Sequence, residues 1–345
     1  MARTSMFALL SLPLLVAASP GSEAPPPAPA PATTTAPTTA ATDGASALET
    51  TALIQPFDID STRRMAVPIM IGGSGPFSFL VDTGAERTVI SRELAARLAL
   101  SEGQRLRLAT ISGSMTAPSY KVAALAMTNM TLGPIDAPAL YGSHIGAAGL
   151  VGVDMLQGRR ILVDFRKELM QISETRRKAR PIIRDDDAIV VTARNLAGRL
   201  ILSDARIDGR RVDVIVDTGA QTSIGNLAML RLVRERKQNR FDFVPASLTG
   251  VNGETVEAQR TILRRVNIEG IDVNDLSISF ADSSAFRALG LSDRPAMLLG
   301  MDGLQLFDRI EVDYVNKRII FDLPDGAAHR AGQRLAASDR RGPRG

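Results

Sequence analysis

The chain has 345 residues, enough for about two domains, and 45% of them are hydrophobic, which suffices for an ordinary core. It has no cysteine and only two histidines, which argues against a thiol nucleophile, a disulfide framework, a Ser-His-Asp triad and a multi-histidine metal site. The net charge is +4, but residues 326–345 carry five arginines against one aspartate. The rest of the chain is therefore close to neutral, which does not suggest a nucleic-acid-binding protein.

The N-terminal 50 residues predict two segments that do not contribute to a core. Residues 1–24 run apolar from Met6 to Ala18 and then become small and polar, as in a secretory signal peptide. The apolar run is too short for an ordinary membrane span, although an uncleaved anchor stays open as the alternative. Residues 25–50 are rich in proline, alanine and threonine, which predicts a disordered linker. We expect a secreted or periplasmic protein without stable membrane insertion after signal removal.

An internal repeat begins after this linker, and its first copy is expected to form one lobe over residues 51–178. Ile71–Ala85 combines a strand, a glycine-rich turn and a second strand that ends in Val-Asp-Thr-Gly-Ala. A serine N-cap and apolar spacing of three and four predict a helix over residues 91–100. Gly149–Leu156 carries an aliphatic pair followed by glycine, and a hairpin pattern follows over residues 161–172.

The second copy, expected over residues 179–325, repeats these features in the same order. Ile207–Ala220 again ends in Val-Asp-Thr-Gly-Ala, and residues 226–234 predict the matching helix. Met297–Leu304 repeats the aliphatic pair with glycine, and a second hairpin pattern follows it. Short strands dominate both halves, so each half is expected to be mostly β. The basic residues 326–345 then predict a disordered tail.

The two Asp-Thr-Gly motifs point to a specific chemistry. Each aspartate, Asp82 and Asp217, follows a run of β-forming apolar residues that would deliver it from a buried strand onto a tight turn. Two such turns facing each other would bring the carboxylates close enough to share one proton. One carboxylate could then act as general base on water while the other protonates the substrate. This chemistry needs no metal and no cofactor.

These motifs resemble those of the retropepsin-like aspartic peptidases, in a bacterial-type, exported form with both lobes in one chain. The resemblance implies a mostly β, bilobal aspartic-peptidase (acid protease) fold of two pseudo-symmetric lobes with a short helix in each. It makes Asp82 and Asp217 the catalytic pair. The same resemblance assigns three further sets of residues: the active-site loops Thr83, Gly84, Ala85, Thr218, Gly219 and Ala220; the supporting motifs Leu150, Val151, Gly152, Leu298, Leu299 and Gly300; and two candidate flaps, turning near Gly113 and at Asn252-Gly253.

Two residues near the supporting motifs have a plainer interpretation. Asp154 and Asp302 each follow the aliphatic-glycine supporting motif of a repeat copy and are expected to cap the short helical turn after it. We therefore expect an aspartic endopeptidase that acts on a peptide or protein, binds no nucleic acid and is a monomer organised as a pseudo-dimer. Two alternatives stay open: a catalytically silent peptide-binding module of the same fold, and a processing protease with a single partner.

Overall fold

The computed structural model describes residues 8–9, 53–60, 63–127, 130–183, 188–196, 199–235, 241–268 and 270–323. The expected linker, the expected tail and most of the expected signal peptide lie outside these residues. Within the signal peptide only β1 (Ala8–Leu9) is described, and it pairs in parallel with β7 of the first lobe.

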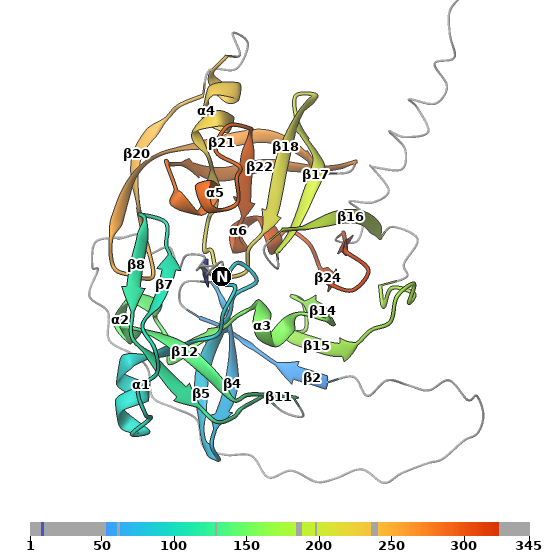
Figure 1. Cartoon of the computed structure of the whole chain (residues 1–345). Helices are drawn as coiled ribbons and strands as arrows, with labels where there is room; N and C mark the ends of the chain where they lie inside the picture. Colours follow the sequence, from blue (N-terminus) through green and yellow to red (C-terminus); the bar gives the residue numbers. More distant parts are fainter. Residues whose placement is uncertain are drawn as a thin grey trace, which may run out of the picture.

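Two mostly β lobes meet along a shared sheet (Figure 1). The elements of the first lobe are β3 (Asp58–Ile59), β4 (Met65–Ile71), β5 (Ser74–Val81), β6 (Val89–Ser91), α1 (Arg92–Arg97), β7 (Leu106–Ala109), β8 (Ser114–Ala117), β9 (Ser119–Val122), β10 (Leu125–Met127), β11 (Met130–Leu132), β12 (Ile135–Leu140), α2 (Gly142–Ile145), β13 (Gly149–Val151) and α3 (Val153–Leu156). Those of the second lobe are β17 (Arg199–Ile207), β18 (Arg210–Val216), β19 (Ser223–Gly225), α4 (Leu227–Arg234), β20 (Val244–Thr249), β21 (Thr255–Ile268), β22 (Ile271–Phe280), α5 (Ser284–Ala288), β23 (Ala296–Leu299) and α6 (Met301–Leu304).

The same strand arrangement occurs at the centre of each lobe. In the first lobe β13 lies between β5, to which it is parallel, and β6, to which it is antiparallel. In the second lobe β23 lies in the same way between β18 and β19. Each lobe thus places the strand before its Asp-Thr-Gly motif beside the strand that carries its supporting motif. The bilobal, pseudo-symmetric fold class is therefore confirmed.

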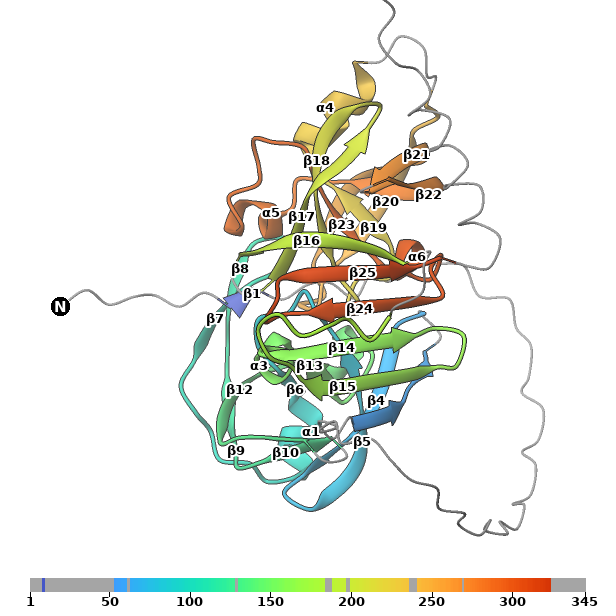
Figure 2. The ribbon, with the colours of Figure 1, turned by 90° about the vertical axis from the view of Figure 1, so that its right-hand side faces the viewer.

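A band of antiparallel strands joins the lobes. Its members are β2 (Leu53–Pro56), β15 (Leu169–Glu174), β14 (Arg159–Asp164), β24 (Arg309–Asp313), β25 (Arg318–Asp322) and β16 (Ile189–Leu196), in that spatial order. Figure 2 shows β16, β25, β24, β14 and β15 stacked between the lobes. The two central strands are the hairpin arms that the repeat predicts in each copy, and they pair from Arg160 with Asp313 to Asp164 with Arg309.

Helices are short in both lobes, and the two expected ones are present. Ser91 caps α1 by accepting a hydrogen bond from the Leu94 N–H at 3.1 Å, and Asn226 caps α4 by accepting one from the Met229 N–H at 2.8 Å. The described residues hold two further short helices in each lobe, α2 and α3 in the first and α5 and α6 in the second. These have four or five residues, too few to produce a periodic pattern that a sequence reading could detect.

Candidate active site

The two Asp-Thr-Gly motifs form tight loops where the lobes meet. Strand β5 leads directly into Asp82 and β18 into Asp217, and both side chains are fully buried. The backbone N–H of Asp82 donates to the Val151 carbonyl at 3.0 Å, and that of Asp217 donates to the Leu299 carbonyl at 3.0 Å. The supporting motif of each lobe thus fixes the start of the loop beside it.

Each aspartate is held by amide donors of its own loop. Oδ1 of Asp82 accepts hydrogen bonds from the N–H groups of Gly84 at 2.9 Å and Ala85 at 2.8 Å. Oδ1 of Asp217 accepts the equivalent bonds from Gly219 at 3.0 Å and Ala220 at 3.2 Å. Such donors orient the carboxylate and favour its ionised form.

The two threonines interlock the loops across the lobe junction. Thr83 Oγ1 donates to the Val216 carbonyl at 3.0 Å, and Thr218 Oγ1 donates to the Val81 carbonyl at 2.8 Å. Each hydroxyl also accepts from the backbone N–H of the other threonine, both at 3.1 Å. All four groups are buried, so this reciprocal set fixes the two loops relative to each other.

The loops approach closely enough that a side chain at Gly219 would not fit. A Cβ at this position would lie 2.3 to 2.5 Å from Cγ, Oδ1 and Oδ2 of Asp82, far inside contact distance. The carboxylate of one lobe therefore rests directly against the loop of the other. The six loop residues that the sequence predicts are thus brought together at one place.

The predicted supporting motifs lie beneath these loops. The Val153 N–H donates to the Ala85 carbonyl at 2.8 Å, and the Met301 N–H donates to the Ala220 carbonyl at 2.8 Å. A Cβ on Gly152 would lie 2.4 Å from the carbonyl carbon of Arg87, so only glycine permits this packing. Backbone hydrogen bonds therefore join each loop to the chain segment that follows the supporting-motif glycine of its own lobe, in agreement with the role that the resemblance implies.

Asp154 and Asp302 do more than the expected capping. Gly152 and Gly300 occupy the N-cap positions of α3 and α6, but Asp154 Oδ1 still accepts from the Met155 N–H at 2.9 Å in the first turn of α3. Asp154 also accepts from the N–H and Oγ1 of Thr88, and Asp302 accepts from the same groups of Ser223. Those hydroxyls in turn accept from the glycine N–H of the supporting motif, at 3.1 Å in both lobes. Burial raises the pKa of Asp302.

Both candidate flaps are antiparallel hairpins, and their tips touch. Strands β7 and β8 form the first, which turns through Gly113, and β20 and β21 form the second, which turns through Asn252 and Gly253. The side-chain amide of Asn252 donates to Oγ of Ser112 at 3.0 Å and to Oγ1 of Thr110 at 3.3 Å. In Figure 1 the two hairpins lie along the same side of the lobe junction.

The apolar residue at each tip is buried against the opposite lobe. Ile111 of the first flap is 1% exposed and belongs to a cluster that includes Ile215 and Leu298 of the second lobe. Val251 of the second flap is also 1% exposed and belongs to a cluster that includes Leu80 and Leu150 of the first lobe. The tip of each hairpin therefore packs against the opposite lobe, and the flap role stays a prediction.

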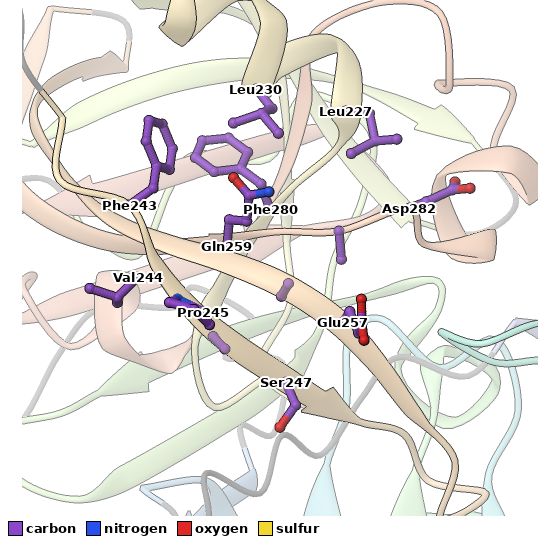
Figure 3. A pocket seen from close by; sticks show the side chains of 13 residues that line it. Leu227, Leu230, Phe243, Val244, Pro245, Ser247, Glu257, Gln259, Phe280 and Asp282 are labelled. Atoms are coloured by element: carbon purple, nitrogen blue, oxygen red, sulfur yellow. The ribbon is translucent and has the colours of Figure 1, made fainter.

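A groove lies along the second flap, between its strands and α4. Its volume is about 840 Å³. Figure 3 shows Phe243, Phe280 and Leu230 gathered toward the helix, with Ser247 and Glu257 further along the hairpin. The lining is mostly apolar with a few polar groups, as is typical of a site that takes a side chain or small ligand.

Two features are absent from the residues that the structure describes. No group of three or more histidine, aspartate or glutamate side chains is arranged to hold a metal ion. Among the same residues, no helix has the length and apolar character needed to cross a membrane.

The fold, the interlocked Asp-Thr-Gly loops and the paired flaps define the architecture of a bilobal aspartic peptidase. A sequence profile of the gag-polyprotein putative aspartyl protease family matches residues 67–158 and again residues 203–305, together more than half of the chain. The chain belongs to this family, with one match in each lobe. A comparison with curated protein sequences finds no match.

Proposed function

We propose that the protein is an aspartic endopeptidase whose catalytic pair is Asp82 and Asp217. The observation that carries this proposal is the reciprocal threonine interlock, which sets two buried aspartates in equivalent surroundings at one point. Peptide hydrolysis is a chemistry for which two such carboxylates suffice without a metal, a cofactor or a covalent intermediate.

The proposed reaction uses one proton shared by the pair. The ionised carboxylate removes a proton from water as the water oxygen attacks the carbonyl carbon of the scissile peptide. The protonated carboxyl group donates its proton to the carbonyl oxygen, which gives a neutral tetrahedral diol. The diol collapses as the carboxyl group that took the water proton gives it to the leaving amine nitrogen, while the other carboxylate removes a proton from a diol hydroxyl. The C–N bond breaks, the hydroxyl oxygen becomes the new carbonyl oxygen, and the pair is again singly protonated.

The flaps and the groove support an extended peptide as substrate. Crossed flaps would cover a bound peptide from both sides and exclude water from the reacting groups. The groove of Figure 3 adjoins one of these flaps and offers apolar surface for a side chain away from the cleaved bond.

The test is incubation of the full chain with a diverse peptide library, read by mass spectrometry. We expect cleavage that Asp82→Asn abolishes and that Asp275→Asn, an exposed aspartate in β22, leaves unchanged. Cleavage of one partner protein but no library peptide would identify the dedicated processing protease. Peptide binding without any cleavage would identify the silent module and contradict the proposal.

We also propose that the protein is exported and that residues 1–24 are removed. The apolar run from Met6 to Ala18 supports this proposal. N-terminal sequencing of the mature protein should find a start between about residues 18 and 27, by the signal-peptide pattern. An intact Met1 on a membrane-bound form would contradict it.

A further inference from the structure

Two buried arginines occupy equivalent positions in the repeat. Arg64 and Arg199 each lie 18 residues before the aspartate of their own lobe, Arg64 directly before β4 and Arg199 as the first residue of β17. Their exposed fractions are only 1% and 3%. An arginine is almost never fully buried unless its charge is paired, so each of these buried guanidinium groups is expected to have specific partners.

Arg199 reaches across the lobe junction to the loop of the other lobe. Its Nε donates to the Gly84 carbonyl at 2.7 Å, and its Nη2 donates to the same oxygen. That carbonyl belongs to the peptide group whose N–H is on Ala85, and this N–H donates to Oδ1 of Asp82 at 2.8 Å. Because the peptide group is planar, one rigid unit connects the guanidinium on one side with the carboxylate on the other.

This arrangement polarises the donor to Asp82. A cation that binds a peptide oxygen makes the N–H of the same peptide group a stronger donor, since hydrogen bonds in a chain reinforce one another at low dielectric. Ala85 itself offers no side-chain hydroxyl to the carboxylate. Arg199 therefore acts on Asp82 from behind the loop, where no substrate needs to lie.

The charges around the two arginines differ. Arg64 is paired with Asp60 of its own lobe, with Nη2 and Oδ2 3.2 Å apart, and it also feels the charge of Asp82. Arg199 faces Asp217, Asp82 and Glu86, together with the phenol of Tyr314. Much of the Arg64 charge is therefore compensated locally, whereas Arg199 acts on both members of the pair.

Protonation states follow from burial. Burial lowers the pKa of the Arg199 guanidinium and the nearby carboxylates oppose this shift, but arginine stays charged at any working pH. Burial also raises the pKa of Tyr314 above its ordinary value, so this phenol is neutral. The positive charge of Arg199 is thus a permanent feature of the surroundings of the pair.

We propose that Arg199 is a positioning residue of the catalytic pair, which acts through the Gly84–Ala85 peptide group to hold Asp82 and to favour its ionised form. This inference rests on the proposed function. It predicts the direction of a pH effect. A cation near a carboxylate stabilises the charged form, so removing the Arg199 charge should make the pair protonate at higher pH.

The experiment compares the pH dependence of kcat/KM for the full chain and three variants on a peptide that the wild type cleaves. Arg199→Met should move both limbs of the bell-shaped profile to higher pH, by roughly one pH unit. Arg199→Lys keeps the charge but loses the planar fork that reaches Gly84, so it should shift the profile less in the same direction. It also carries the test if the methionine variant does not fold.

Arg63→Met is the matched control. Arg63 also crosses between the lobes, through Nε and Nη2 bonds to Gln305 Oε1 at 3.0 and 2.6 Å, but it is exposed and touches neither loop. Loss of the Arg63 side chain can weaken the contact between the lobes without shifting the pH profile of kcat/KM. Carboxyl ¹³C chemical shifts followed against pH report the same titration without any turnover, and they should show Asp82 protonating at higher pH in Arg199→Met.

The outcomes separate this inference from the function on which it rests. Folded Arg199 variants whose pH profiles and carboxyl titrations match the wild type would show that Arg199 is only a structural link and would overturn the inference. A wild-type chain that cleaves no peptide at any pH would contradict the proposed function instead, and the ¹³C titration would still decide the role of Arg199.

Discussion

At the scale of single residues, the tightest constraint is the contact between Gly219 and the carboxylate of Asp82. A methyl group at Gly219 would overlap all three carboxylate atoms, and the loop cannot retreat because Thr218 is bonded to the opposite loop. The side chain that must move is therefore Asp82 itself.

We predict that Gly219→Ala abolishes peptide hydrolysis and lowers the free energy of unfolding by about 1–3 kcal/mol, as overpacking of a core does. Gly270→Ala is the control for stability alone. Its φ of +93° disfavours alanine, but it lies in the turn between β21 and β22 and its added Cβ would meet nothing within 4 Å. Chemical denaturation and peptide assays distinguish the two, and a Gly219→Ala variant with normal turnover would refute the described contact.

At the scale of elements, the two candidate flaps contact each other through their tips. Ser112 and Asn252 occupy the same position in the two tips and are hydrogen-bonded to each other at 3.0 Å. The tip residues Ile111 and Val251 are buried against opposite lobes, so under the proposed function we expect a peptide to enter only after the tips separate.

We predict that the double variant Ser112→Cys with Asn252→Cys loses at least about ten-fold in turnover when oxidised and recovers it when a thiol reductant is added, because a disulfide holds residues within a few ångström. The natural chain has no cysteine, so no other thiol competes. Ser112→Cys alone, treated in the same way, is the control. A variant that mass spectrometry shows to be fully cross-linked, yet that hydrolyses peptides as fast when oxidised as when reduced, would exclude flap opening as a requirement.

Much of this element-scale picture could be predicted from the duplicated motifs. Asp82 and Asp217, their loops, the supporting glycines and both hairpins follow from local patterns that occur twice. The burial of Ile111 and Val251 in opposite lobes could not be predicted, because it depends on contacts between segments far apart in the chain. The hydrogen bonds from Thr88 to Asp154 also could not be predicted, because they join residues far apart in the chain. From the local pattern alone, an aspartate in this position predicts a helix cap.

The arginines could have been found from the sequence by one further step. Arg64 and Arg199 are separated by the same 135 residues that separate Asp82 and Asp217. A residue type that recurs at the same distance from the aspartate in both copies can therefore be recognised as part of the repeat, even where the neighbouring residues differ. What the sequence does not contain is the direction of the Arg199 side chain, which depends on how the lobes pack.

At the scale of the whole molecule, the lobes share one sheet and one site. Strands β14 and β24 pair across the junction, the threonines interlock above them, and each lobe contributes one aspartate and one flap. Both halves of the site therefore come from a single chain. We still predict that the protein acts as a monomer, because one chain supplies both halves of the site.

We propose that Asp82 and Asp217 act as one unit across this junction. The most direct test is a double-mutant cycle on kcat/KM with Asp82→Asn, Asp217→Asn and the variant that carries both. Residues that act as a unit are strongly non-additive, so we predict that each single variant loses about 10³-fold or more and that the double variant is no slower than either. Losses that multiply in the double variant, or wild-type turnover in either single variant, would contradict a shared catalytic pair.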